Sequence, residues 1–263
     1  MIKKEKKHVS QDDPMRFFEP NRSKLEEKNY RLALDSFYSG SGGSNFEKLQ
    51  NFTRHVPTQD IRKFVCRNEI FKKILDIHGS IIDCGIGFGG SLFTWAQLSE
   101  VYEPLNHTRN IIGFDTFAGF PKVTQKDENK FSIQSKQGGL TIDSYKDLAE
   151  AIKLYNMNRF LPQIEKVKLV RGDVSKTIPK YIGDNPHLVI SLLHLDFDIY
   201  EPTKVALELF VPRMPKGSVI VFDELNHEMW PGETVATLEF FKTLNRLEIR
   251  RFAYGSTLSY AIL

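Results

Sequence analysis

The sequence has few of the features that would assign a chain to a specialised class of protein. Only two cysteines, Cys66 and Cys84, occur among its 263 residues, and they form no recognisable pattern. No apolar run approaches the roughly 20 residues that a membrane-spanning helix needs. The charged residues 1–7 are not followed by the apolar segment of a signal peptide. We therefore expect a cytoplasmic protein that has no membrane partner.

A strong charge of one sign is also missing. The net charge is only +3, and the aromatic residues are not interleaved with basic clusters, so we expect no nucleic-acid partner. A length of 263 residues, with 41% hydrophobic and 26% charged residues, is sufficient for one α/β domain and an appendage. We assign residues 56–263 to this domain. Residues 1–55 are assigned to a partly flexible N-terminal arm, disordered over residues 1–14, that can act as a helical lid and exclude water from a site.

Two apolar, β-prone segments each end in a pair of acids. Their lack of alternation is typical of strands that are buried on both faces of a parallel sheet. Ligands bind at the carboxyl ends of such strands. Four neighbouring carboxylates repel one another, so a bound Mg²⁺ is the simplest compensation, and helix caps with surface charges are the alternative. The segments are residues 188–193, followed by Asp196 and Asp198, and residues 218–222, followed by Asp223 and Glu224.

A glycine-rich turn lies between an expected strand and an expected helix. Gly85, Gly87 and Gly90 fit the dinucleotide pattern G-x-G-x-x-G, which is a weak signal when it stands alone. Asp83 is more informative, because an acid that faces the ligand at the tip of the strand repels a pyrophosphate but attracts the ammonium group of S-adenosylmethionine. We therefore favour S-adenosylmethionine over NAD as the cofactor. A structural turn beside an incidental acid is the other interpretation.

Acids at the ends of the next two expected strands favour nucleoside binding. Asp115 follows residues 109–114, at the position where a carboxylate holds a pair of ribose hydroxyls. Asp173 follows residues 167–171 and is placed to accept a hydrogen bond from an adenine amino group, with Val174 against the ring. A cap of the following helix is an equally good interpretation of Asp173.

Strands that alternate with helices predict a mostly parallel α/β sheet with helices on both faces. We expect residues 249–252 and 258–262 to form an antiparallel hairpin at one edge of this sheet. Residues 122–140 form a polar connection of unusual length. For this reason we expect them to form a second flap over the site.

Several segments of the chain resemble the macrocin O-methyltransferase family, and most of all its nucleotide-sugar (TDP-rhamnose) O-methyltransferases. These are class I S-adenosylmethionine-dependent enzymes, many of them dependent on Mg²⁺, that methylate sugar hydroxyls in natural products. The resemblance covers roughly residues 56–263. It is carried by residues 83–90, 113–121, 195–203, 223–224 and 230–232.

The resemblance implies a Rossmann-like class I methyltransferase fold with a seven-stranded sheet, S-adenosylmethionine as the methyl donor, and a homodimer or larger homo-oligomer. The acceptor that it implies is a small molecule, either a sugar or a nucleotide-sugar. It places metal ligands at Asp196, Asp223 and Glu224, although related enzymes usually have Asp or Asn at the third position. The cofactor contacts fall in the glycine turn and at the ends of the next two strands: Asp83, Gly85, Gly87, Gly89, Ser91, Asp115, Thr116, Asp173 and Val174.

Methyl transfer from a sulfonium to a hydroxyl requires the oxygen, carbon and sulfur atoms to be aligned, and the hydroxyl must lose its proton. We predict that Asp196 is both metal ligand and proton acceptor, with Asp198 and His227 as the next candidates. His194 is equally well explained as a core histidine. Three alternatives stay open: an amine or phosphoryl-linked acceptor, an NAD-dependent oxidoreductase, and a binding module without catalysis.

Overall fold

The computed structural model describes residues 13–255 and 257–263. Residues 1–12, part of the segment for which we expect disorder, lie outside the described residues. The chain divides into two compact units. The helical unit consists of residues 1–58 and 130–134, and the sheet unit consists of residues 59–129 and 135–263.

The helical unit contains α1 (Leu25–Gly40), α2 (Asn45–Gln50) and the 3₁₀ turn η1 (Phe52–Arg54). The helix α2 begins with a capping box, in which the Ser44 side chain accepts a hydrogen bond from the Glu47 N–H and the Glu47 carboxylate accepts one from the Ser44 N–H. The Glu19 carboxylate accepts hydrogen bonds from the Ser132 hydroxyl and the Ile133 N–H, which joins a segment of the predicted flap to this unit. Within the described part of the N-terminal arm, residues 25–40 and 45–50 are helical, as predicted, and the role of the arm as a lid stays a prediction.

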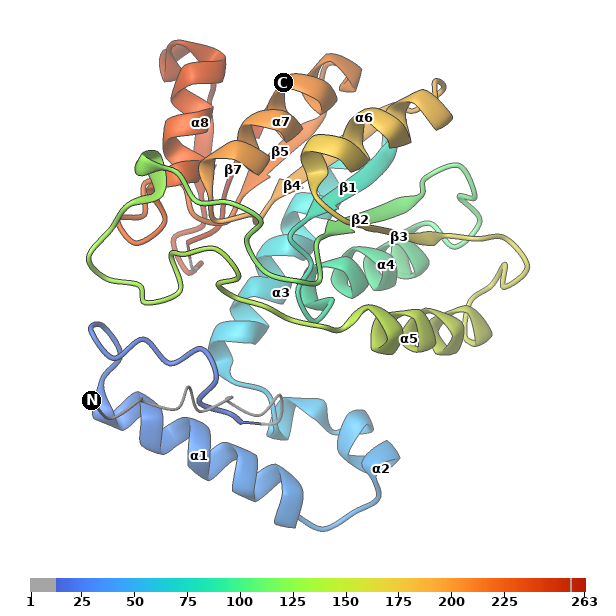
Figure 1. Cartoon of the computed structure of the whole chain (residues 1–263). Helices are drawn as coiled ribbons and strands as arrows, with labels where there is room; N and C mark the ends of the chain where they lie inside the picture. Colours follow the sequence, from blue (N-terminus) through green and yellow to red (C-terminus); the bar gives the residue numbers. More distant parts are fainter. Residues whose placement is uncertain (1–12, 256) are drawn as a thin grey trace. The chain divides into compact units, whose positions relative to one another are not determined.

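The sheet unit is built on seven strands in the order β3-β2-β1-β4-β5-β7-β6 (Figure 1). Neighbouring strands from β3 to β5 are parallel, whereas β7 is antiparallel to both β5 and β6. The predicted seven-stranded, mostly parallel sheet with an antiparallel C-terminal pair is thereby confirmed. The strands are β1 (Ser80–Cys84), β2 (Ile111–Asp115), β3 (Val167–Arg171), β4 (Ile190–Leu195), β5 (Val219–Phe222), β6 (Ile249–Arg251) and β7 (Ser259–Ile262).

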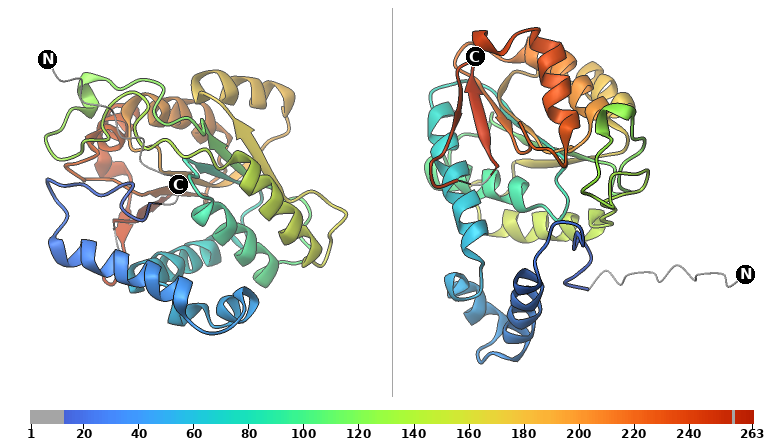
Figure 2. Two further views of the ribbon diagram at one scale, coloured as in Figure 1. Left: turned by 60° about the horizontal axis from the view of Figure 1, so that its bottom comes forward. Right: turned by 90° about the vertical axis from the view of Figure 1, so that its left-hand side faces the viewer.

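Helices cover both faces of this sheet (Figures 1 and 2). Alternate strand residues supply two separate cores. Ile81 and Leu192 belong to the core under α3, α4 and α5, while Ile82 and Leu193 belong to the core under α6, α7 and α8. The helices are α3 (Thr58–Phe71), α4 (Gly90–Tyr102), α5 (Tyr145–Met157), α6 (Val174–Asp184), α7 (Tyr200–Phe210) and α8 (Pro231–Phe241), with the 3₁₀ turns η2 (Lys72–Ile74), η3 (Gln125–Asp127), η4 (Val211–Arg213) and η5 (Leu244–Arg246).

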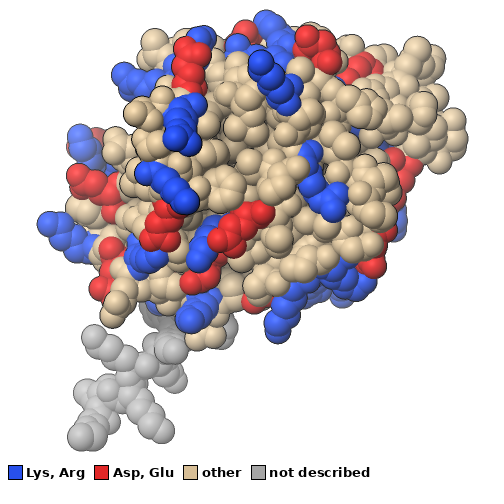
Figure 3. Space-filling view, turned by 90° about the horizontal axis from the view of Figure 1, so that it is seen from above, with Lys and Arg blue, Asp and Glu red and all other residues tan. Residues whose placement is uncertain are grey.

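The surface carries charges of both signs. On the face that Figure 3 shows, Lys and Arg side chains lie among Asp and Glu side chains rather than in one basic area. Within residues 13–255 and 257–263, no helix has the length and apolar character that a bilayer crossing requires.

Candidate active site

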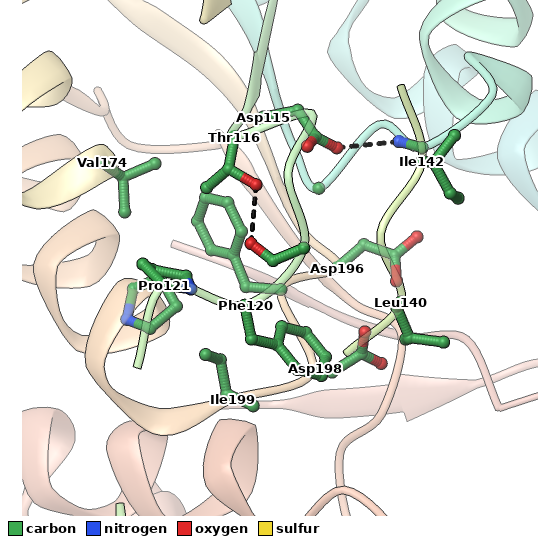
Figure 4. Close-up of a pocket in the computed structure, with 15 residues that line it drawn as sticks. Asp115, Thr116, Phe120, Pro121, Leu140, Ile142, Val174, Asp196, Asp198 and Ile199 are labelled. Atoms are coloured by element: carbon green, nitrogen blue, oxygen red, sulfur yellow. Dashed lines mark hydrogen bonds between the residues drawn. The ribbon is translucent and has the colours of Figure 1, made fainter. Parts of the chain in front are cut away.

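A pocket lies at the carboxyl ends of the parallel strands of the sheet unit (Figure 4). This is the position at which open α/β sheets bind ligands. Phe120 and Leu140, from the two ends of the long connection between β2 and α5, also line it. Seven of the residues that the sequence predicts for the site are in the lining: Gly85, Gly87, Asp115, Thr116, Val174, Asp196 and Asp198.

Gly85 allows the glycine turn to pass directly against the end of β4. Its φ is +78°, and a Cβ atom added to it would lie 1.9 Å from the backbone oxygen of Asp196. Only glycine tolerates both the backbone conformation and the close approach. The turn that is predicted to bind the cofactor and the loop that carries the acids are therefore in backbone contact.

Asp115, at the end of the neighbouring strand β2, holds the glycine turn in place. Its Oδ2 accepts a hydrogen bond from the Gly87 N–H at 2.9 Å, and its Oδ1 accepts one from the Phe117 N–H at 2.7 Å. Burial raises the pKa of the Asp115 carboxyl, and these hydrogen bonds oppose the increase. The hydroxyl of Thr116 donates to the Gly119 carbonyl at 2.7 Å (Figure 4). Contact of Asp115 and Thr116 with a cofactor stays a prediction.

Asp83 is fully buried and does not line the pocket, in contrast to the orientation expected from the sequence. Its Oδ1 lies 2.5 Å from Nδ1 of His194, the residue beside it on β4. The His194 ring packs edge-on against Trp95 of α4, with 5.8 Å between the ring centroids. The physical reason for the difference is the sheet pairing, which gives the Asp83 carboxylate an internal partner. Its contact with the cofactor stays a prediction.

Three further predicted cofactor residues lie at helix starts. Gly89, with φ +85°, precedes α4, and Ser91 is buried in the first turn of that helix. Asp173 is the N-cap of α6, since its carboxylate accepts a hydrogen bond from the Ser175 N–H at 3.0 Å. The capping interpretation of Asp173 is therefore observed. Whether these residues also contact a cofactor stays a prediction.

The two acidic strand ends come together in the structure. One carboxylate oxygen of Asp196, one of Asp223 and one ring nitrogen of His194 lie within 4.8 Å of one another. Burial raises the pKa of Asp196 well above its usual value, and the charge of Asp223 adds to this increase. Such a concentration of acid, with Asp223 buried and Asp196 half-buried, is expected to attract a cation.

Lys63, which the sequence analysis did not single out, supplies positive charge to this group. Its Nζ lies 3.6 Å from Oδ2 of Asp223. Burial alone would raise the pKa of Asp223, but the charges of Lys63 and Arg67 lower that pKa overall. Lys63 and Arg67 are four positions apart on α3, so they share one helix face. That spacing is the signal by which the sequence could have indicated Lys63.

The remaining acids surround this group. Asp198 has a φ of +62°, and burial raises its pKa to about 8. Oε2 of Glu224 lies 2.9 Å from Nδ1 of His227, and burial raises the pKa of Glu224 to about 9. Glu233, which no sequence pattern indicated, is fully buried and accepts a hydrogen bond from the Glu224 N–H at 3.1 Å. Glu224 thus lies beside a histidine, and its carboxyl also interacts with that of Asp223.

Comparisons with known proteins identify the family. Residues 59–249 match the family model of the macrocin O-methyltransferase, TylF. The chain belongs to this family. It is 31% identical to the calicheamicin methyltransferase CalS11 over 97% of this chain and 98% of that chain, with a TM-score of 0.86. An apo structure of CalS11, described as a TDP-rhamnose 3′-O-methyltransferase, is 30% identical over 92% and 96% of the two chains, with a TM-score of 0.78.

A more distant solved structure, that of the O-methyltransferase NovP, shares the fold. It is 17% identical over 77% of this chain and 79% of that chain, with a TM-score of 0.57. A search of curated proteins gives no match.

As a member of the macrocin O-methyltransferase family, the chain is an S-adenosylmethionine-dependent methyltransferase. The oxidoreductase and the non-catalytic module are thereby set aside. The residues present also fit a divalent cation. Oδ1 of buried Asp223 has no hydrogen-bond partner among the described residues, and together with an oxygen of Asp196 it offers the carboxylate donors that hard cations prefer.

Proposed function

We propose that this methyltransferase transfers the methyl group of S-adenosylmethionine to a hydroxyl of a sugar, either nucleotide-linked or part of a natural product, with the assistance of Mg²⁺. The observation that carries the proposal is the match of nearly full length to CalS11, a TDP-rhamnose 3′-O-methyltransferase. The acids at the ends of β4 and β5 support it independently, because a sugar hydroxyl is a poor nucleophile until it loses its proton.

The glycine turn and its neighbours are proposed to hold the methyl donor. Gly85 and Gly87 allow the backbone to approach the cofactor closely. Asp115 retains free lone pairs beside its two backbone hydrogen bonds, with which it would accept hydrogen bonds from the ribose hydroxyls. Val174 would pack against the adenine ring. Phe120, from the connection that lines the pocket, would exclude water from the reacting atoms.

Asp196 is proposed to act on the acceptor. It lines the pocket together with Asp198 (Figure 4), and one of its carboxylate oxygens lies within 4.8 Å of one of Asp223. From there its carboxylate can orient the acceptor hydroxyl and accept its proton. A divalent cation held by Asp196 and Asp223 would lower the pKa of that hydroxyl. Asp198 and His227 are the next candidates for the proton acceptor.

Methyl transfer by the full-length protein tests the proposal. Purified protein is incubated with S-adenosylmethionine and TDP-rhamnose, and the gain of one methyl group is followed by mass spectrometry. We expect methylation that EDTA suppresses and Mg²⁺ restores. Asp196→Asn is expected to lower turnover by about a hundredfold or more while S-adenosylmethionine binding, measured by calorimetry, persists.

Further measurements decide the class of acceptor and the roles of Asp196 and Mg²⁺. Methylation of an amino-sugar nucleotide but not of TDP-rhamnose would favour the amine acceptor over the hydroxyl. Full turnover by Asp196→Asn would reject this residue as the proton acceptor, and full turnover in EDTA would reject the role of Mg²⁺. The homo-oligomeric state and the cytoplasmic location stay predictions.

A further inference from the structure

Three arginine side chains are buried among the described residues, and the chain itself supplies partners for two of them. Arg109 donates hydrogen bonds to three backbone carbonyls and one hydroxyl, and its Nε lies 2.7 Å from Oε1 of Glu103. Arg159 donates to the Ile164 carbonyl at 2.7 Å and pairs with Glu100 at 3.5 Å. Such partners are needed because a guanidinium keeps its charge when it is buried.

Arg67 on α3 is the third buried arginine, and it lacks partners of this kind. Its side chain is as buried as that of Arg159, with 7% exposed in each. Nε of Arg67 has no hydrogen-bond partner within residues 13–255 and 257–263, and no carboxylate in these ranges forms an ion pair with its guanidinium. An unpaired buried charge is costly. The missing partner must therefore come from solvent or from a ligand.

The position of Arg67 favours a ligand. It follows Lys63 by one turn of α3, and helical side chains lean toward the helix N-terminus, so Arg67 leans toward Lys63 and the acids beside it. Nζ of Lys63 lies 3.6 Å from Oδ2 of Asp223. Burial raises the pKa of Asp196, and the charges of Lys63 and Arg67 oppose this increase. Because Asp196 lines the pocket, the Arg67 guanidinium lies within electrostatic range of the candidate active site.

The chemistry of a guanidinium limits what this ligand can be. Its N–H groups form a planar fork that matches the two oxygens of a carboxylate or a phosphate. A neutral sugar ring has no such group. The methionyl end of S-adenosylmethionine carries a carboxylate, and a nucleotide-linked sugar carries a diphosphate. Each of these substrates can therefore supply the oxyanion that the chain does not.

We propose that Arg67 binds an oxyanion of a substrate in this site, either the methionyl carboxylate of the donor or the diphosphate of a nucleotide-linked acceptor. The second source rests on the proposed function, whereas the first requires only a donor that is S-adenosylmethionine. Arg67 then determines specificity, because a substrate without the oxyanion leaves a buried guanidinium unpaired. The competing explanation is a counter-charge that only stabilises Asp223.

Calorimetry on the full-length wild type and on Arg67→Met tests the proposal with two pairs of ligands. S-adenosylmethionine is compared with its decarboxylated form, and TDP is compared with thymidine. We expect Arg67→Met to lose about 10- to 100-fold of affinity for the oxyanion-bearing ligand of one pair. The other ligand of that pair should bind both proteins equally. Loss of affinity for S-adenosylmethionine identifies the carboxylate, and loss for TDP identifies the diphosphate. Arg67→Lys keeps the charge without the fork and should restore part of the affinity.

Two further variants separate binding from folding. Arg62→Met removes an exposed charge from the same helix and should change none of the four affinities. The thermal midpoint of Arg67→Met should stay within about 3 °C of the wild type, because no internal partner is lost. Arg109→Met removes a guanidinium that the chain has fully engaged and should lower the midpoint much further.

Unchanged affinities of Arg67→Met for all four ligands would overturn the proposal. A fall of its midpoint as large as that of Arg109→Met would also overturn it, in favour of a structural counter-charge. If TDP does not bind the wild type, the nucleotide-linked acceptor is rejected, while the donor pair still decides whether Arg67 binds the carboxylate.

Discussion

Oδ1 of Asp127 accepts a hydrogen bond from the backbone N–H of Tyr200 at 2.6 Å. Oδ2 accepts two more at 2.8 Å, from the N–H and the hydroxyl of Thr124. The carboxylate is buried, and Tyr200 begins α7 directly after the loop of Asp196 and Asp198. One buried side chain therefore joins the connection between β2 and α5 to the acidic end of β4.

We expect Asp127→Ala to destabilise the fold by about 2 to 4 kcal/mol, because it leaves three donors without their acceptor. The KM for S-adenosylmethionine should rise as well, since both ends of the same connection line the pocket. Denaturant unfolding and steady-state kinetics check the two effects. Glu128→Gln, a change at the exposed neighbouring residue, is the control and should alter neither. Wild-type stability in Asp127→Ala would contradict the joining role.

Gly85→Ala should disrupt the site, because the new Cβ atom would lie 1.9 Å from the backbone oxygen of Asp196. The backbone must shift, so we expect a loss of about 3 kcal/mol or more together with loss of S-adenosylmethionine binding. Thermal unfolding and calorimetry measure these quantities. Gly183→Ala on α6 is the control, since no atom lies within 4 Å of its added Cβ. It should be neutral or stabilising by up to about 1 kcal/mol, and equal behaviour of the two variants would refute the close contact as the cause.

Lys63→Met is expected to raise the affinity for Mn²⁺ or Mg²⁺ by about threefold to tenfold, because the Lys63 ammonium, 3.6 Å from Asp223, repels a cation and competes for this carboxylate. Calorimetric titration of the EDTA-treated protein measures the change. Lys72→Met removes a more exposed ion pair with Glu69 and should leave the affinity unaltered. A fall in affinity after Lys63→Met would show that Lys63 helps to form the cation site.

Lys166 makes the free energy of unfolding depend on pH. Burial lowers the pKa of Lys166 from 10.5 to about 8, and its Nζ donates to the Asn106 carbonyl at 2.6 Å. Between pH 8 and 10.5 the unfolded chain binds more protons at this residue than the folded chain does, so its contribution to stability rises with pH by about 3 kcal/mol across that window. Below pH 8 both states are protonated and the full destabilisation is present.

Unfolding free energies of the wild type and Lys166→Met, measured from pH 7 to 11, check this effect. Their difference should change with pH in the stated direction. Lys168→Met, on β3, controls for the loss of a surface charge, since Lys168 pairs only loosely with Glu165 at 3.6 Å. Parallel pH curves for the wild type and Lys166→Met would exclude Lys166 as the source.

The local pattern was sufficient to predict the framework of the site. The apolar segments without alternation form β4 and β5. Carboxylate oxygens of the acids that follow them, Asp196 and Asp223, lie within 4.8 Å of each other. The prediction succeeded because the carboxyl ends of parallel strands always lie at the same edge of a sheet. The positive-φ conformation of Gly85 and Gly87 likewise follows from a sharp turn between a strand and a helix.

The partners of individual side chains could not be predicted in this way. Asp83 was expected to face the ligand, yet it pairs with His194, 111 positions further along the chain. Lys63 and Glu233 come to the acid cluster from α3 and α8, and nothing near the acids in the sequence indicates them. Each of these contacts depends on which strand or helix lies beside which.

The linear order of residues was thus enough to predict the strands, the turns and the edge of the sheet that carries the candidate site. Each of these features follows from the conformational preferences of neighbouring residues. Packing alone decides which acid has a histidine or a lysine beside it, and which acid keeps a carboxylate oxygen without a hydrogen-bond partner. Hydrogen bonds and ion pairs act only over a few ångströms, and the sheet order and helix docking bring distant segments within that range.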